Sequence, residues 1–162
     1  MKEIKLLFMD VDGTLTDGKI YIAEDGEFCK AFDIKDGYGI HDILPRHKII
    51  PVVISARESE IVTKRCKELD IFEVYQSCRD KRQKMIEIAC KYGITLNENN
   101  ILEQTAYIGD DMLDLQCMTI AQYIGCPADA VEEVKAVADF ISHKNGGKGA
   151  VREFIEWLCA NQ

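Results

Sequence analysis

Two carboxylates stand two residues apart at the point where an apolar run ends. Residues 4–9 are almost entirely apolar, and Asp10, Val11, Asp12 and Gly13 follow them directly. A buried strand with this ending places charge at the carboxyl end of a strand, where open α/β sheets bind ligands. Such charge is costly unless it is paired, hydrated or bound to a metal. The alternative is an ordinary polar turn, in which Asp and Gly are common.

Three further polar features follow or begin predicted elements: Ser55, Lys81 and the segment 109–114, Gly-Asp-Asp-Met-Leu-Asp. Each has a purely structural alternative. Ser55 fits a helix N-cap with Glu58 completing a capping box, Lys81 fits a solvated lysine, and paired aspartates favour a helix N-terminus. These separate alternatives do not explain why a hydroxyl, an ammonium and several carboxylates all fall at the same edge of the parallel sheet that the strands described next are predicted to form.

The elements that must position these groups alternate between short apolar runs and amphipathic segments, the pattern of βαβ units. Strands are predicted at residues 4–9, 49–54, 72–75, 105–108, 122–124 and 140–142. Helices are predicted at residues 58–69, 80–92, 111–118, 129–137 and 150–159. Residues 19–23 and 28–32 predict a β-hairpin. We therefore expect a Rossmann-like, doubly wound α/β fold with a parallel sheet, a hairpin inserted after the first strand, and all strand carboxyl ends at one edge.

Composition narrows the class of protein. A chain of 162 residues predicts one domain over 1–162, and its net charge of −8 argues against nucleic acid or an anionic membrane as partner. Seven scattered cysteines without a Cys-x-x-Cys pair favour free thiols in a reducing compartment. With no signal-peptide pattern and no membrane-spanning apolar run, we expect a cytoplasmic protein.

Taken in order, the four polar features resemble the motifs of the haloacid dehalogenase superfamily of phosphohydrolases. Residues 10–14 look like its first motif, Ser55 its second, Lys81 its third and residues 109–114 its fourth. The resemblance implies a magnesium-dependent phosphomonoesterase that forms an aspartyl-phosphate intermediate on Asp10. It also implies that Asp12 protonates the leaving oxygen and then deprotonates the hydrolytic water.

The same resemblance assigns the remaining residues of the motifs. Asp10, the backbone carbonyl of Asp12 and the side chain of Asp110 are implied as the protein ligands of Mg²⁺. Ser55 and Lys81 are implied to hold the phosphoryl oxygens of the substrate. Asp111 and Asp114 are then expected to orient these ligands or the Lys81 ammonium.

The gaps between the four motifs are too short to hold a separate cap domain. Residues 12–18, 32–40 and 146–153 resemble the capless 3-deoxy-D-manno-octulosonate 8-phosphate phosphatases, which act in lipopolysaccharide biosynthesis. That branch implies a homotetramer in which hairpins pack into a central barrel and a neighbouring subunit closes each site. It also implies that the Gly-rich segment 146–149 helps to cover the site, whereas the structural alternative is a flexible connector before a helix.

Contacts to a sugar acid are expected from Arg57, Lys148 and Arg152, although Arg57 also fits an ordinary surface arginine at a helix start. Ala56 stands where the family usually has glycine, which affects the expected substrate placement rather than the catalysis. Two alternatives remain at this stage. One is a phosphatase for the 9-phosphate of a nine-carbon keto-deoxy sugar acid, and the other is a catalytically silent binding module.

Overall fold

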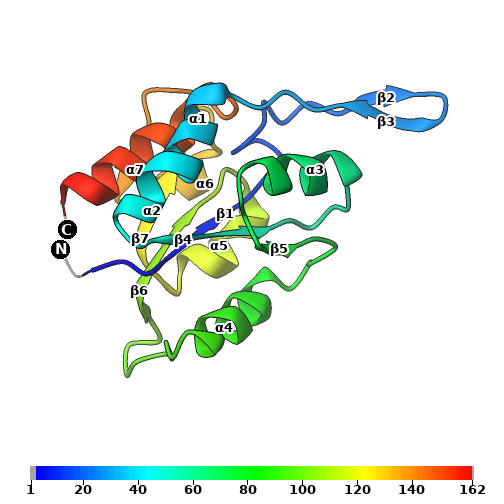
Figure 1. Cartoon of the computed structure of the whole chain (residues 1–162). Coiled ribbons are helices and arrows are strands. Elements are labelled where there is room, and N and C mark those ends of the chain that lie inside the picture. Colours follow the sequence, from blue (N-terminus) through cyan, green and yellow to red (C-terminus); the bar gives the residue numbers. More distant parts are fainter. Residues whose placement is uncertain (1–2, 162) are drawn as a thin grey trace.

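The computed structural model describes residues 3–161 and has three layers, with a parallel sheet between two layers of helices (Figure 1). The six strands of the sheet lie in the order β5-β4-β1-β6-β7-β8. Their bounds are β1 Leu6–Met9, β4 Ile50–Ile54, β5 Glu73–Tyr75, β6 Leu102–Ile108, β7 Ala121–Cys126 and β8 Phe140–Ile141. Every neighbouring pair is parallel. The predicted doubly wound α/β fold is confirmed.

The central strand β1 fixes where the polar residues meet. All four of its residues are buried, as expected for a strand covered on both faces. Met9 is in register with Val53 of β4 on one side and with Ile108 of β6 on the other. The carboxyl ends of these three strands are therefore nearly level, and the residues that follow them come out at one edge of the sheet.

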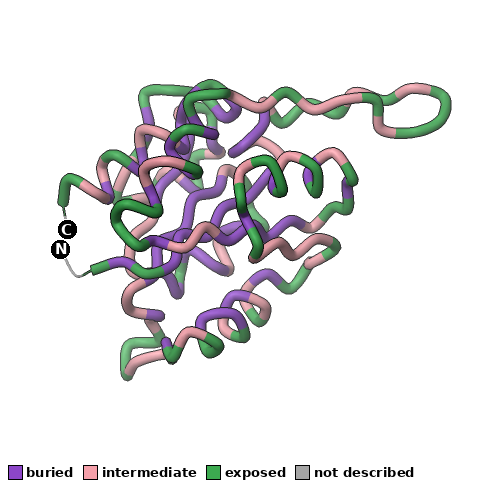
Figure 2. Tube along the Cα trace, viewed as in Figure 1, coloured by how far each residue is buried: buried purple, intermediate pink, exposed green. Residues whose placement is uncertain are grey.

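Helices cover both faces of the sheet. One core cluster packs against α3 Glu60–Glu68 and α7 Ala150–Ala160, and the other packs against α4 Lys81–Lys91, α5 Met112–Met118 and α6 Glu132–Lys135. Figure 2 shows the buried residues along the strands and on the inner sides of these helices. Among the described residues, no helix combines the length and apolar character needed to cross a bilayer.

The sequence predictions missed the helical segment over residues 34–46. It consists of α1 Ile34–Tyr38, a π-helical turn η1 Gly39–Ile43 and the short α2 Leu44–Arg46. Two glycines and a proline lower its helix propensity, which hides it from pattern analysis. Both glycines lie at close tertiary contacts, since a Cβ on Gly37 would lie 2.6 Å from Arg65 Nη2 and one on Gly39 would lie 3.1 Å from Arg152 Cδ.

Other elements differ from prediction mainly at their ends. The predicted helix 129–137 is only α6 Glu132–Lys135, because the Val131 N–H donates to the Asp110 carbonyl at 3.0 Å and holds the preceding residues in a turn. The predicted hairpin is present as β2 Tyr21–Ala23 and β3 Gly26–Cys29. It projects from the body of the molecule (Figure 1).

A buried carboxylate joins the missed segment to the last helix. Asp36, on α1, is 2 % exposed, and its Oδ1 accepts the Arg152 N–H of α7 at 2.7 Å. The backbone N–H groups of Gly149 and Val151 lie near this carboxylate and act to lower its pKa. Asp36 thereby satisfies one donor at a helix N-terminus that has no capping side chain of its own.

Burial raises the pKa of Asp36 to about 6 from its ordinary value of 3.8. A carboxyl whose pKa is higher in the folded state stabilises the fold below its unfolded pKa and loses that contribution as pH rises through the folded value. The unfolding free energy of the wild type minus that of Asp36→Asn should therefore increase by about 2–3 kcal/mol between pH 7.5 and pH 4. Urea titrations across this range measure it. Asp25→Asn, in the hairpin turn, is the control, and a pH-independent difference would contradict the assignment.

Candidate active site

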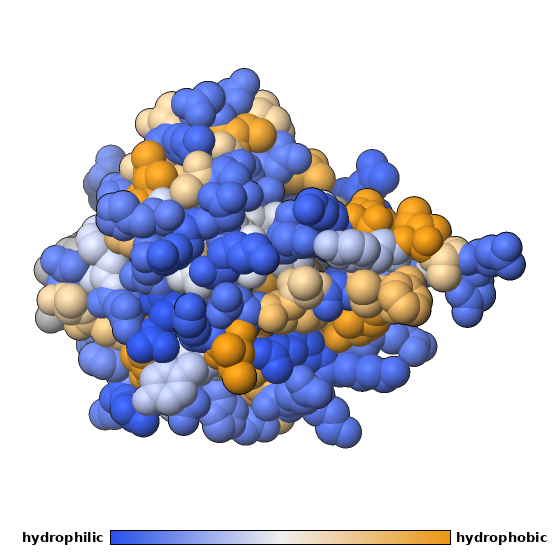
Figure 3. Space-filling view, turned by 90° about the horizontal axis from the view of Figure 1, so that it is seen from above, coloured by the Kyte–Doolittle hydropathy of each residue, from blue (hydrophilic) through white to orange (hydrophobic). Residues whose placement is uncertain are grey.

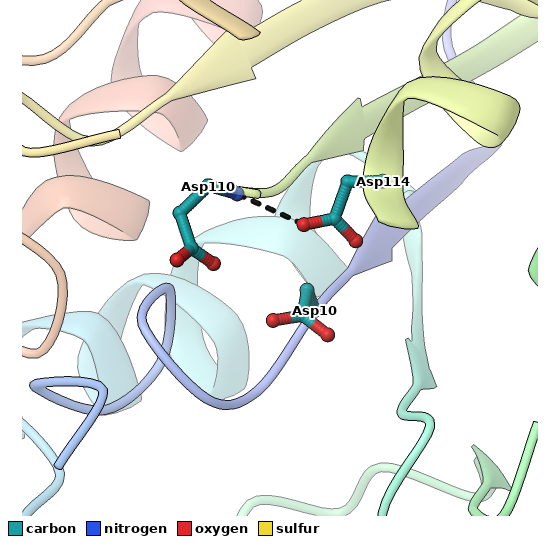
Figure 4. A group of neighbouring side chains, drawn as sticks. All are labelled: Asp10, Asp110 and Asp114. Carbon is teal, nitrogen blue, oxygen red and sulfur yellow. Dashed lines mark hydrogen bonds between the residues drawn. The ribbon is translucent and has the colours of Figure 1, made fainter. Parts of the chain in front are cut away.

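Three carboxylates converge at the edge of the sheet (Figure 4). Asp10 follows β1, Asp110 follows β6, and Asp114 lies in the first turn of α5. One oxygen from each carboxylate lies within 4.8 Å of the others. The adjacency of β1 and β6 in the sheet brings together residues about a hundred positions apart in the chain.

Lys81 lies between two of these carboxylates. Its Nζ is 2.5 Å from Asp10 Oδ1 and 2.7 Å from Asp114 Oδ1, and its side chain is 2 % exposed. Asp80 caps α4 by accepting the Gln83 N–H, which sets Lys81 as the first residue of the helix. An ammonium buried to this extent requires such partners, so the alternative of a solvated lysine is excluded.

Every oxygen of Asp114 is engaged. Oδ1 accepts the Tyr107 hydroxyl at 2.7 Å besides Lys81, and Oδ2 accepts the N–H groups of Asp110 at 3.0 Å and Asp111 at 3.2 Å. A Cβ on Gly109 would lie 2.4 Å from the Asp114 Cγ, so this close approach requires glycine. Asp114 therefore fixes the loop between β6 and α5 and orients the Lys81 ammonium.

Asp110 is held against the loop that follows β1. The Thr14 hydroxyl donates to Asp110 Oδ1 at 2.9 Å. Gly13 has a φ of +100°, and a Cβ there would lie 2.0 Å from Asp110 Oδ2. The Asp-x-Asp-Gly-Thr sequence thus gives the backbone the turn and the close approach that this carboxylate needs.

Three ionised carboxylates that are buried this close together repel one another, so their charged forms are unfavourable. Burial, followed by the charge of Asp114, raises the pKa of Asp10 well above its ordinary value and that of Asp110 to about 7. Burial alone would lower the pKa of Lys81, but Asp10 and Asp114 outweigh it and raise that pKa. One ammonium does not balance the three carboxylates. The oxygen donors and the excess negative charge fit a hard divalent cation such as Mg²⁺.

A cavity of about 200 Å³ opens above the cluster. It is lined by Asp10, Asp12, Ser55, Ala56, Arg57, Lys81, Asp111, Leu113 and Asp114. The Ser55 hydroxyl oxygen accepts the Arg57 N–H at 3.2 Å, which leaves its hydrogen free to donate into the cavity. A cavity of this size holds a phosphate group, but it is smaller than the clefts that enclose whole organic ligands.

Asp12 lies at the wall of this cavity between two cations. Lys30 Nζ is 2.5 Å from its Oδ1, and Arg57 Nε is 3.8 Å from its Oδ2. Arg57 is half-exposed. The structure thus brings Arg57 to the same cavity as the motif residues.

Lys148 and Arg152 do not line the cavity. Lys148 is exposed, and its charge acts on Asp17. The Arg152 guanidinium bonds Glu156 at 2.6 Å and lies 4.9 Å from the centre of the Tyr38 ring. Within this subunit, the structure therefore does not bring these two predicted substrate contacts to the site.

The first two glycines of the segment 146–149 are held by hydrogen bonds and close contacts. The Gly147 N–H donates to the Thr14 carbonyl at 3.1 Å, and the Gly146 N–H donates to Asp129 Oδ1 at 2.9 Å. A Cβ on Gly146 would lie 1.8 Å from the Gly13 carbonyl oxygen. Within this subunit the segment contacts the loop after β1 and does not line the cavity, so its covering of the site stays a prediction.

Three further residues belong to the site and were not predicted from the sequence: Thr14, Tyr107 and Lys30. Thr14 lies within the first motif and Tyr107 in the strand before the fourth, so the positions of both offered a signal. Lys30 carried none, because only the folded hairpin brings it to Asp12. A larger apolar groove of about 510 Å³, lined in part by Pro51, Phe72 and Tyr92, lies at the amino ends of β4 and β5, away from the carboxylates.

No family model matches the chain, but individual proteins do. It is 37 % identical to the 3-deoxy-D-manno-octulosonate 8-phosphate phosphatase of Salmonella typhi, over 99 % of this chain and 82 % of that protein. A crystal structure of the same-named phosphatase from Moraxella catarrhalis, in complex with magnesium, phosphate and KDO, matches with a TM-score of 0.89 and 39 % identity, covering 98 % of this chain and 87 % of that one. The structure of a haloacid dehalogenase (HAD) superfamily hydrolase from Legionella pneumophila matches with a TM-score of 0.89 and 31 % identity, covering 98 % of this chain and 84 % of that one.

Removing the Lys81 ammonium should destabilise the fold strongly. Lys81→Met leaves Asp10 and Asp114 buried without their cation, and such a loss costs about 3–5 kcal/mol. The matched control is Lys84→Met on the same helix, where a partly exposed lysine pairs with Glu87 and the change should stay within about 0.5 kcal/mol. Urea unfolding in the presence of chelator measures both variants. Equal unfolding free energies for the two would contradict the assigned role of the buried pair.

Proposed function

The chain belongs to the 3-deoxy-D-manno-octulosonate 8-phosphate phosphatase family of the haloacid dehalogenase superfamily, and from this premise we propose that it hydrolyses that sugar phosphate to the free sugar acid and phosphate. The single observation that carries the proposal is the buried Lys81 between Asp10 and Asp114 at the floor of a phosphate-sized cavity. A silent binding module would have no need of this costly arrangement.

Hydrogen-bond donors are available for a phosphoryl group. An ammonium has three donors, and Lys81 uses two of them on Asp10 and Asp114, so one remains for a phosphoryl oxygen. The Ser55 hydroxyl supplies a second donor. We propose that these two groups hold the transferring phosphoryl oxygens and stabilise the charge that develops on them.

Asp10, the backbone carbonyl of Asp12 and Asp110 would hold the magnesium ion. The fit rests on the chemistry of the ligand atoms, since all three are hard oxygens. Asp114, the other nearby carboxylate, already accepts hydrogen bonds from four donors. When bound, the ion supplies positive charge against the phosphate dianion, which lets an anionic nucleophile approach.

Two steps then account for the hydrolysis. A carboxylate oxygen of Asp10 forms a bond to phosphorus while the bond from phosphorus to the ester oxygen breaks, and Asp12 gives its proton to that leaving oxygen. The oxygen of a water molecule next forms a bond to phosphorus while the bond from phosphorus to the Asp10 oxygen breaks, and Asp12 takes up a proton from that water. Phosphate leaves, and Asp10 and the protonated Asp12 are restored. Asp111 and Asp114 act by orienting their neighbours.

We propose Arg57 as the residue of this subunit that meets the sugar acid's carboxylate. It lines the cavity, is half-exposed and is free to turn toward a ligand at the mouth. Lys148 and Arg152 do not line the cavity of their own subunit, so we assign them no contact with the sugar acid there.

We also propose that the chain forms a homotetramer in which a neighbouring subunit completes the site. An isolated two-stranded hairpin is marginal in water, yet this one exposes 75 % of Ile22 and 72 % of Phe28. Apolar atoms gather over the projecting hairpin at the right of the space-filling view (Figure 3). Further copies of the chain would bury these side chains and add walls to the small cavity.

Phosphate release tests the proposed activity. With Mg²⁺, the wild type should release phosphate from 3-deoxy-D-manno-octulosonate 8-phosphate, and Asp10→Asn should lose all measurable turnover because its amide cannot act as the nucleophile. Asp80→Asn is the matched control, since Asn retains the N-cap of α4 beside Lys81. Turnover by Asp10→Asn equal to that of the wild type would contradict the assigned nucleophile. Much faster turnover of a nine-carbon 9-phosphate would overturn the substrate.

Disrupting the hairpin surface tests the proposed assembly. Phe28→Asp should lower the molecular mass measured by light scattering. It should also reduce kcat/KM for the sugar phosphate by about tenfold or more, which is a loss of about 1.4 kcal/mol in transition-state stabilisation. Turnover of a small aryl phosphate, which needs little enclosure, should fall less. Phe72→Asp is the control, because Phe72 is 90 % exposed at the far end of the sheet. Equal losses on the two substrates would count against a shared site.

A further inference from the structure

Lys30 is a buried cation that has no part in the two steps of hydrolysis described above. It follows β3 directly, and its side chain is 1 % exposed. Its Nζ is 2.5 Å from Asp12 Oδ1 and 2.8 Å from Glu27 Oε1. Two carboxylates therefore compensate the buried ammonium, and one of them is the proposed acid–base group.

Glu27, the second carboxylate bound to Lys30, is itself held by the hairpin and by the start of α3. Glu27 lies in β3, and its second oxygen accepts the hydroxyl of Ser59, the N-cap residue of α3. Gln76 accepts the Ser59 N–H at 2.8 Å and so fixes that residue from the far side. Lys30 is thus held by the root of the hairpin, and the position of the hairpin sets the position of the ammonium.

The two oxygens of Asp12 are not equivalent. Oδ1 accepts a short bond from the buried Lys30, whereas among the described residues Oδ2 has only the 3.8 Å contact with the half-exposed Arg57. Because Asp12 lines the cavity, Oδ2 is the oxygen available to exchange a proton there. A carboxylate fixed at one oxygen is restricted in rotation, which is what an acid–base group must have to reach a leaving oxygen repeatedly.

We propose that Lys30 is a positioning residue, supplied by the hairpin, that fixes the Asp12 carboxylate for proton transfer to the leaving oxygen. The inference rests on the proposed phosphatase function. It links the hairpin to the chemistry of its own subunit, in addition to any role of the hairpin between subunits. Lys30 does not line the cavity, so it acts through Asp12.

Leaving-group dependence distinguishes this role from a merely structural one. An alkyl phosphate such as 3-deoxy-D-manno-octulosonate 8-phosphate needs its leaving oxygen protonated, whereas 4-nitrophenyl phosphate releases a stable phenolate without help. Lys30→Met should lower kcat/KM for the alkyl ester by about 10²-fold, at the lower end of what general acid–base groups contribute. It should leave kcat/KM for the aryl ester within about threefold, since that ratio reports only the steps up to phenolate release.

The second step gives an independent readout. Without a fixed Asp12, hydrolysis of the aspartyl-phosphate slows, so kcat and KM for the aryl ester should fall together and a burst of 4-nitrophenolate should precede steady turnover. Lys30→Arg, which retains a cation, should recover part of the loss. The matched control is Lys19→Met, an exposed lysine on the other arm of the hairpin, which should match the wild type.

Outcomes separate the inference from the function on which it rests. Equal losses of kcat/KM on both esters, or full activity of Lys30→Met on the alkyl ester, would overturn the role of Lys30 while leaving the phosphatase intact. A wild type that is inactive on both esters with Mg²⁺ would instead overturn the proposed function. If Lys30→Met does not fold, Glu27→Gln removes the ammonium's anchor in the hairpin, and the same discrimination between the two esters is then required of that variant.

Discussion

One ammonium buried among carboxylates is the constraint on which the rest of this structure depends. Lys81 contacts Asp10 and Asp114 at the edge of the sheet, and neither the charge nor its partners can be removed singly at low cost. The adjacency of β1 and β6, the N-cap that starts α4 and the glycine that admits Asp114 all serve to place these groups. The arrangement retains an excess of negative charge, which is what a divalent cation and then a phosphate ester would use.

Support for this cluster extends well beyond the motif residues. Gly146 and Gly147 pack against the loop after β1 and so support it from a distant part of the chain. Asp36 joins α1 to the start of α7, directly after these glycines. The first turn after β1 is therefore supported by a segment near the last helix, and small residues are required where these backbones meet.

The strands, most helices and the hairpin followed from the sequence, because apolar runs and amphipathic periods are local signals. The sequence also predicted that four polar residues lie at one edge of the sheet, because each stands directly after a strand or at the start of a helix. These are Asp10, Ser55, Lys81 and Asp110. The helical segment 34–46 did not, since Gly37 and Gly39 lower its propensity and only tertiary contacts explain them. The contact of Lys30 with Asp12, and the distance of Arg152 from the cavity, depend on side-chain directions that no local pattern encodes.

The central claim is that Asp10 is the residue that becomes phosphorylated. Asp12→Asn should slow the second step, whereas the first step needs no proton on the leaving oxygen of 4-nitrophenyl phosphate. An acid quench of this variant during turnover of 4-nitrophenyl phosphate with Mg²⁺ should therefore trap the intermediate. Peptide mass spectrometry of the quenched protein locates the phosphoryl group. The account predicts an acid-stable, hydroxylamine-sensitive acyl phosphate on the peptide that contains Asp10. Turnover without any phosphorylated peptide, or a phosphoryl group on another residue, would contradict it.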